Sequence, residues 1–141
     1  MTNHNFGVAL FDKWTSLWNG EFELAEEIMA PKFRLRYAQP QTEPMDSVTT
    51  PEALVALIGI WREKRGSPTF RAEGRAVTAF DQQDKQTNGV VVRPYSTTFP
   101  VEGSIKTVSG IDSLQFIDGK IVEVLSASGG VAGRSFNFTD K

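Results

Sequence analysis

One acidic residue, Asp112, interrupts an otherwise apolar stretch that ends in the tight turn Asp118-Gly119. In a β-strand, side chains alternate between two faces, so Asp112 shares its face with residues at even spacings. These neighbours are Val108, Gly110, Leu114 and Phe116. Burying an ionised carboxyl group without a partner is very costly. Asp112 must therefore be protonated, hydrogen-bonded or placed at the wall of a cavity that admits water or a ligand.

Two interpretations of Asp112 follow. In the first, it is a cavity acid that donates a proton to, or takes one from, a carbonyl-bearing ligand. In the second, its carboxylate is satisfied by backbone groups or by a cross-strand arginine such as Arg93. The residues leave both open, and Asp112 is the predicted catalytic residue if the protein is an enzyme.

Metal and thiol chemistry find no support in the sequence. It has no cysteine and a single histidine, His4, in a terminal segment that we expect to fray. Zinc and iron sites need cysteine, histidine or carboxylate ligands at suitable spacings. We therefore predict no metal site and no cofactor, and we give His4 no catalytic role.

Three helices are predicted to position these residues. Apolar residues spaced by three and four predict a helix over Phe6–Trp18, which Asn19-Gly20 ends. A shorter helix is expected over about Glu21–Ala30, closed by Pro31. A third begins after Thr50, with a proline at its first position, and ends at Gly66.

The rest of the chain reads as strands. Alternation predicts a strand over 33–37, with Tyr37 facing inward like Asp112, and residues 38–49 read as a loop. A four-stranded meander then covers about 69–80, 89–99, 104–117 and 120–128, with a polar hairpin over 81–88. Asp118-Gly119 is a strong hairpin signal, and Pro94 indicates an edge strand or a bulge.

This order of elements predicts an α+β fold in a single domain covering residues 1–141. Three N-terminal helices would pack on a strongly curved mixed or antiparallel sheet and enclose a conical cavity. Aromatic residues from several elements are the candidates to line it: Trp14, Trp18, Tyr37, Trp61, Tyr95 and Phe116. Simple core packing is the competing interpretation for each tryptophan.

The apolar strand entering Asp118-Gly119-Lys120-Ile121-Val122-Glu123 resembles the nuclear transport factor two-like superfamily. Its members include ketosteroid isomerases and SnoaL-like polyketide cyclases, and the resemblance covers nearly the whole chain. The run Ile111-Asp112-Ser113-Leu114-Gln115-Phe116 is similar to the isomerase pattern that carries the oxyanion-hole acid. The resemblance therefore implies that Asp112 takes this role, with Trp14 in place of the tyrosine that assists it.

The sequence departs from both enzyme types at the expected base. Tyr37 occupies the position of the isomerase aspartate, and a tyrosine with a pKa of about 10 is a poor base near neutrality. The cyclases place a carboxylate on the last strand, where this chain has Ser126 and Ser128. Any isomerase or cyclase activity would therefore lack the usual base, and these serines become candidate ligand-binding residues.

Composition limits the partners. A formal net charge of −2 argues against a nucleic-acid partner, and no apolar run is long enough to span a bilayer, so we expect a cytoplasmic protein. Val90, Val92, Ile105 and Ile111 would suit a homodimer interface on the outer sheet face. Residues 129–141 form a tail that is flexible, or whose Phe136 and Phe138 close the pocket or contact a partner.

Two main functions remain open. In the first, the protein is an isomerase, cyclase or dehydratase that acts on a small apolar carbonyl compound with Asp112 as the key acid. In the second, the same pocket holds a hydrophobic ligand without catalysis, or the domain serves for dimerisation with a filled interior.

Overall fold

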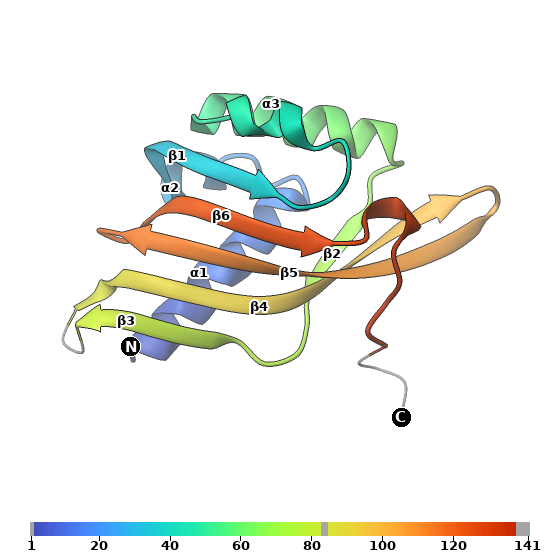
Figure 1. The fold of residues 1–141 in the computed structure, drawn as a ribbon. Coiled ribbons are helices and arrows are strands. Elements are labelled where there is room, and N and C mark those ends of the chain that lie inside the picture. Colours follow the sequence, from blue (N-terminus) through green and yellow to red (C-terminus); the bar gives the residue numbers. More distant parts are fainter. Residues whose placement is uncertain (1, 83–84, 138–141) are drawn as a thin grey trace.

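Three α-helices pack on a six-stranded mixed sheet in the computed structural model, which describes residues 2–82 and 85–137 (Figure 1). The helices are α1 (Asn3–Trp18), α2 (Leu24–Ile28) and α3 (Pro51–Lys64). The α1 and α3 helices have side-chain caps: Thr2 accepts from the Asn5 amide, and Thr50 accepts from the Ala53 amide. Their apolar faces are buried against the sheet, which confirms the predicted α+β class.

Two expectations about the helices were wrong. The second helix was predicted over Glu21–Ala30, but α2 is short, and Met29, Ala30 and Pro31 already belong to the first strand. Proline is tolerated there because this strand lies at the sheet edge, where an amide can be left unpaired. His4 does not lie in a frayed end: it is part of α1, and its Nδ1 lies 3.0 Å from the Thr78 hydroxyl.

The strands follow the order β1-β6-β5-β4-β2, and β3 also pairs with β4. The pairing of β1 with β6 is parallel, and every other pairing among the described residues is antiparallel. Their bounds are β1 Met29–Tyr37, β2 Thr69–Ala72, β3 Val77–Gln82, β4 Lys85–Val101, β5 Ser104–Ile117 and β6 Lys120–Ser128. Two 3₁₀ helices, η1 (Glu43–Ser47) and η2 (Gly130–Ala132), lie in the loop after β1 and after β6.

The segment predicted as one strand over 69–80 is in fact two, β2 and β3. The chain leaves β4 between them, where Gly74 adopts a φ of +63°. Pro94 of β4 faces this gap, so its missing amide costs no ladder hydrogen bond, and its carbonyl accepts from the Glu73 amide. The expectation that Pro94 marks an edge strand or bulge was therefore wrong, because β4 lies inside the sheet and only its partner is interrupted.

The hairpin between β5 and β6 follows the sequence signal closely. Asp118 and Gly119 have φ angles of 52° and 76°, as a two-residue turn with both central residues left-handed requires. The two strands begin and end at the predicted residues, 104–117 and 120–128. The turn places Phe116 opposite Ile121, and a register shift between Gln115 and Phe116 then moves the pairing by one residue, so that Ser126 lies opposite Asp112. The predicted polar hairpin over 81–88 lies partly outside the described residues, since 83–84 are not covered.

Candidate functional site: a buried acid at the wall of an aromatic cavity

The candidate site begins with one row of side chains across four strands. Asp112 on β5 is the register partner of Ser126 on β6 and of Arg93 on β4, and Ser126 in turn pairs with Tyr37 on β1. Partners in adjacent strands lie about 5 Å apart and point to the same face. The sheet therefore brings Tyr37 and Asp112 to one surface, as alternation in both strands predicted.

Asp112 is buried, with 6% of its surface exposed, and one of its two oxygens has a partner. The Trp14 indole N–H of α1 donates to Oδ2 over 3.0 Å. Oδ1 is buried and has no hydrogen-bond partner among the described residues. Because an indole nitrogen can only donate, Oδ2 must act as an acceptor, so a proton bound to Asp112 would sit on Oδ1.

Burial raises the pKa of Asp112 from 3.8 to about 6, while the Ser126 hydroxyl and then the Trp14 N–H lower it in part. Near neutral pH, a group with this pKa is about nine-tenths ionised yet remains close to its protonated form. This position suits a group that both takes and returns a proton.

The competing interpretation, neutralisation by Arg93, does not hold for the described residues. The Arg93 guanidinium pairs with Asp12 of α1, with Nη1 and Oδ1 at 3.3 Å, and no ion pair joins it to Asp112. Its Nε is buried without a hydrogen-bond partner. Asp112 is therefore held by an indole and influenced by a hydroxyl, both neutral groups.

Ser126 lies beside Asp112 and contributes a hydroxyl rather than a charge. Its Oγ is buried, and no hydrogen bond of ordinary geometry joins it to another described residue. It nevertheless lowers the pKa of both Asp112 and Tyr95, so it is close enough to interact electrostatically with each. Ser126 thus lies between the acid and a tyrosine hydroxyl.

Gly110 makes room for Tyr95. These two residues pair across β4 and β5, and the Tyr95 ring lies over the glycine. A Cβ added at Gly110 would come within 2.5 Å of the Tyr95 hydroxyl and within 2.8 Å of the Ser128 Cβ. The glycine therefore allows Tyr95 to reach across the sheet toward Ser126 and Ser128.

A cavity of about 370 Å³ opens beside this row. Its size falls in the range of roughly 300–1,000 Å³ that is typical of small-molecule sites. Trp18 is the centre of its aromatic wall, with ring contacts at 5.4–6.3 Å to four other aromatic residues. These are Trp14, Tyr37, Trp61 and Phe70.

Two tyrosine hydroxyls belong to this wall. Burial and the charge of Asp112 raise the pKa of Tyr37 and of Tyr95 above the usual 10, so both remain protonated donors at neutral pH. Neither hydroxyl forms a hydrogen bond of ordinary geometry within the described part of the chain. The Tyr37 hydroxyl is available to a ligand oxygen, whereas the Tyr95 hydroxyl also lies near Ser126 and Ser128, whose hydroxyls lower its pKa.

Most of the predicted site residues come together here. The cavity is lined by Asp112 together with Trp14, Trp18, Tyr37, Trp61, Tyr95 and Ser128. Ser126 lies buried beside Asp112 and does not line it. Phe116 was wrongly placed at the cavity: it is fully buried against Phe6 and Phe80 at another part of the core, four residues further along β5.

Sequence reasoning missed several residues of the wall. Phe70, Leu57, Thr97 and Phe99 line the cavity, as do Gln39 and Thr42 from the loop after β1. Phe70 and Phe99 lie in predicted strands, where an aromatic residue could have been considered for the cavity wall. Gln39 and Thr42 lie in a loop without periodicity, which gives no signal of this kind. Gly110, in the middle of β5, is a further signal in the sequence, because a glycine inside a strand often marks the close approach of another group, here Tyr95.

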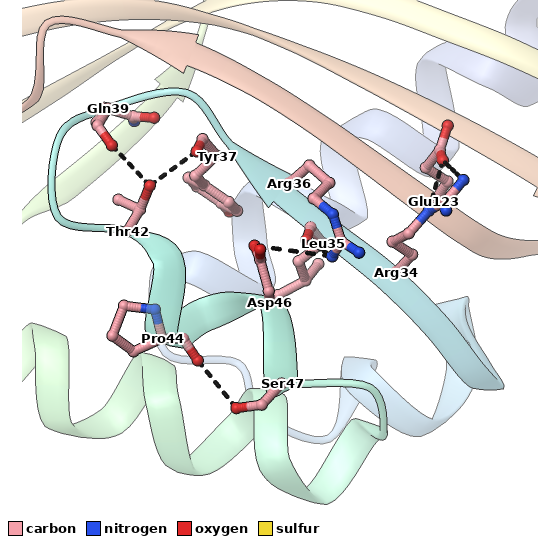
Figure 2. A network of polar contacts seen from close by, with 10 residues as sticks. All are labelled: Arg34, Leu35, Arg36, Tyr37, Gln39, Thr42, Pro44, Asp46, Ser47 and Glu123. Carbon is pink, nitrogen blue, oxygen red and sulfur yellow. Dashed lines mark hydrogen bonds and ion pairs between the residues drawn. The ribbon is translucent and has the colours of Figure 1, made fainter.

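The loop after β1 is fixed by Thr42, whose hydroxyl lies 2.7 Å from the carbonyl oxygens of both Tyr37 and Gln39 (Figure 2). Gln39 in turn donates to the Ser128 hydroxyl over 2.8 Å. Arg36 pairs with Asp46 of η1 on the outer side of β1. The cavity wall is therefore held in place by backbone contacts as well as by packing.

The described part of the tail, up to residue 137, runs beside β5. The Ser109 amide donates to the Arg134 carbonyl, and the Phe136 amide donates to the Ser109 hydroxyl. Val131 and Gly130 contribute to the cavity wall, whereas the half-exposed Phe136 does not. Phe138, the other residue expected to close the pocket, lies outside the described residues.

Comparison with solved structures places this architecture. A provisionally assigned polyketide cyclase from Acidithiobacillus ferrooxidans superposes with a TM-score of 0.70 at 15% identity, over 91% of each chain. A provisionally assigned SnoaL-like polyketide cyclase from Jannaschia gives 0.66 at 17% identity, over 92% of this chain and 89% of that one. The chain has the nuclear transport factor two-like fold. The resemblance predicted from the β5–β6 hairpin is thereby confirmed for the fold.

A third structure with this fold, a provisionally assigned isomerase of the SnoaL-like family from Agrobacterium tumefaciens, gives a TM-score of 0.64 at 16% identity, over 89% of this chain and 99% of that one. No protein-family model and no curated protein sequence matches the chain. At such low identity, these structures share the nuclear transport factor two-like fold with this chain, and the fold does not determine the chemistry of the cavity.

The described residues contain neither a candidate metal site nor a candidate membrane span. Among the described residues, no group of three histidine, cysteine or acidic side chains is placed to hold a metal ion. No helix in the same residues is long and apolar enough to cross a membrane.

Proposed function

We propose that this protein binds a small apolar carbonyl compound and catalyses proton transfer next to its carbonyl group, as an isomerase, cyclase or dehydratase does. The observation that carries the proposal is the state of Asp112. It is a buried carboxyl group at the wall of an aromatic cavity, with one oxygen held by Trp14 and the other without a partner. Solved structures with the same fold include provisionally assigned cyclases and an isomerase, which supports this choice.

In the proposed reaction, ionised Asp112 takes the proton from the carbon beside the carbonyl. The electron pair of that C–H bond moves to the carbonyl oxygen and forms an enolate. The hydroxyl of Tyr37 or Tyr95 donates a hydrogen bond to this oxygen, and its raised pKa keeps it in the donor form. Protonated Asp112 then returns the proton to carbon, so no second base is needed.

This assignment differs from the role implied by the ketosteroid isomerases. There, the resemblance made Asp112 an oxyanion-hole donor and left the base missing at Tyr37. Here the indole N–H stabilises the ionised carboxylate, which favours Asp112 as the base, and the tyrosines take the donor role. The cavity has no other acidic residue among its described lining, which is consistent with one group doing both proton transfers.

The test is α-proton exchange of 2-tetralone, an apolar bicyclic ketone, in D₂O followed by NMR. The wild-type protein should accelerate exchange above the buffer rate, and Asp112→Asn should abolish the acceleration while 2-tetralone still quenches tryptophan fluorescence. Tyr95→Phe should slow exchange, because one donor to the enolate oxygen is lost. If 2-tetralone binds and Asp112→Asn exchanges as fast as the wild type, the catalytic role of Asp112 is refuted.

A non-catalytic carrier remains the alternative, and the same experiment separates it. Three tryptophans line the cavity, so quenching reports binding independently of turnover. Binding without any exchange in the wild type would support the carrier. The conical shape of the cavity and the cytoplasmic location stay predictions.

We also propose that two copies associate through the outer sheet face. Apolar side chains on this face are 41–75% exposed, more than core packing would leave. They are Val77, Ile105, Ile111 and Leu125, whereas the predicted Val90 and Val92 are partly buried. Sedimentation velocity should find a dimer that Ile111→Lys disrupts, and a wild-type monomer at every concentration would contradict the proposal.

A further inference from the structure

Arg65 is a second charged residue at the cavity, and its guanidinium has no partner among the residues that the structure describes. It follows the last residue of α3, and its side chain lines the cavity while remaining exposed. Within the described residues Arg65 makes no ion pair. Its one hydrogen bond there is made by its backbone amide, which donates to the Trp61 carbonyl. Arg62, one turn earlier, is already engaged, because its Nη1 donates to the carbonyls of Trp18 and Pro68.

Arg65 and Asp112 occupy opposite ends of this cavity. Along β5, the lining extends from Asp112 to Val108, about 13 Å away at ~3.3 Å per residue. Phe99 continues the wall along β4, and Gly66, next to Arg65, packs on the following Pro100, where an added Cβ would lie 2.8 Å from the proline ring. In Figure 1, the end of α3 also lies toward the side of the molecule that carries the β4–β5 hairpin.

The wall between the two charges is mainly apolar, with the Thr97 side chain as a neutral polar group on β4. Trp61, Phe70, Phe99 and Val108 separate the acid from the guanidinium, and no further charged side chain lines the cavity among the described residues. A ligand that fills this space is therefore long and apolar, with different chemistry at its two ends.

We propose that the ligand carries an anionic group, of the carboxylate class, which Arg65 binds while the carbonyl group lies at Asp112. The planar guanidinium presents paired donors that match a carboxylate. The negative charge of ionised Asp112 repels the same group, so a keto acid enters in one orientation only. This inference rests on the proposed function and names the substrate class of that site.

The experiment uses ω-benzoylalkanoic acids of increasing chain length and their methyl esters, titrated against tryptophan fluorescence. In the wild type, each acid of sufficient length should bind about 5- to 20-fold more tightly than its ester, less than a buried charge-assisted hydrogen bond gives because Arg65 is exposed. The preference should grow with chain length until the carboxylate reaches Arg65, and it should shrink in high salt.

Arg65→Gln should remove the preference for the acid and weaken acid binding far more than ester binding. Lys64→Gln is the matched control, since Lys64 is an exposed cation on the same helix end that does not line the cavity. It should keep most of the preference. Equal binding of acids and esters in the wild type, or equal effects of the two variants, would overturn the assignment to Arg65.

The two proposals fail in different ways. If esters bind and exchange their α-protons but acids gain nothing, the anion site is refuted and the proton-transfer function stands. If acids bind through Arg65 but no α-proton exchanges, the anion site stands and catalysis is refuted. If neither series binds, both proposals are refuted.

Discussion

Replacing Trp14 by phenylalanine should raise the pKa of Asp112 and so reduce its activity as a base. The change removes the single N–H that donates to Oδ2 and keeps an aromatic ring in the wall. A hydrogen bond to a charged group contributes about 1.5–3 kcal/mol, and about 1.4 kcal/mol corresponds to one pKa unit. The pKa should therefore move from about 6 to about 7–8.

The consequence at neutral pH is large because the pKa lies close to it. The ionised fraction at pH 7 should fall from about nine-tenths to a half or less, with a matching loss of exchange rate. The acid limb of the pH–rate profile should shift upward by about one to two units, while the rate at high pH changes less. The carboxyl carbon of Asp112, followed by ¹³C NMR through a pH titration, measures the pKa directly.

Trp61→Phe is the matched control for this prediction. Trp61 also lines the cavity and contacts Trp18, but its indole does not donate to Asp112. It should leave the titration of Asp112 in place. If Trp14→Phe leaves the pKa unchanged, or Trp61→Phe shifts it equally, the indole does not set the ionisation of this acid and the argument for Asp112 as the base fails.

Two further predictions concern stability. The pKa of Asp112 is raised above its unfolded value, so its contribution to stability is complete below about pH 4 and falls by about 3 kcal/mol as the pH rises through about 6. Urea unfolding should show this loss of stability. In Asp112→Asn, this part of the pH dependence should disappear. Gly110→Ala should lower the free energy of unfolding by about 1–3 kcal/mol, because its Cβ would collide with Tyr95 and Ser128, whereas Gly59→Ala in α3 should be neutral or stabilise by up to about 1 kcal/mol. Equal urea midpoints for the two alanine variants would refute the close approach at Gly110.

The sequence predicts the parts of this fold that local signals decide. Thr50-Pro51 fixes the start of α3, and Asp118-Gly119 fixes the hairpin, so β5 and β6 have their predicted ends. Alternation along β5 places Asp112 correctly on the inner face, but the register shift between Gln115 and Phe116 that brings Ser126 opposite it has no signal in the turn. The single strand predicted after Pro68 was wrong for a different reason. The break at Gly74 lies where the chain would pair with Pro94 of β4, which has no amide to donate, and the sequence of the strand alone does not show this pairing.

Contacts between distant segments are what the sequence could not supply. That Arg93 pairs with Asp12 rather than with Asp112 depends on how α1 crosses β4. Phe116 and Asp112 share a face, yet only Asp112 reaches the cavity, because Phe6 and Phe80 fill the space over Phe116. A period of two identifies a face and does not say which part of that face is hollow.

The residue at position 14 determines what kind of chemistry the acid can perform. A phenol can donate a hydrogen bond and accept one, so it can stand between a neutral acid and a ligand oxygen. An indole has one donor and no acceptor, and here that donor is spent on Oδ2 of Asp112. This contact favours the ionised carboxylate and leaves Trp14 nothing to offer the ligand. In the proposed reaction, the oxygen of the ligand must then turn to Tyr37 or Tyr95, whose rings reach the cavity from β1 and β4. The proposed role of Asp112 as the base therefore rests on the indole at position 14, whose single donor is already bound to the carboxylate.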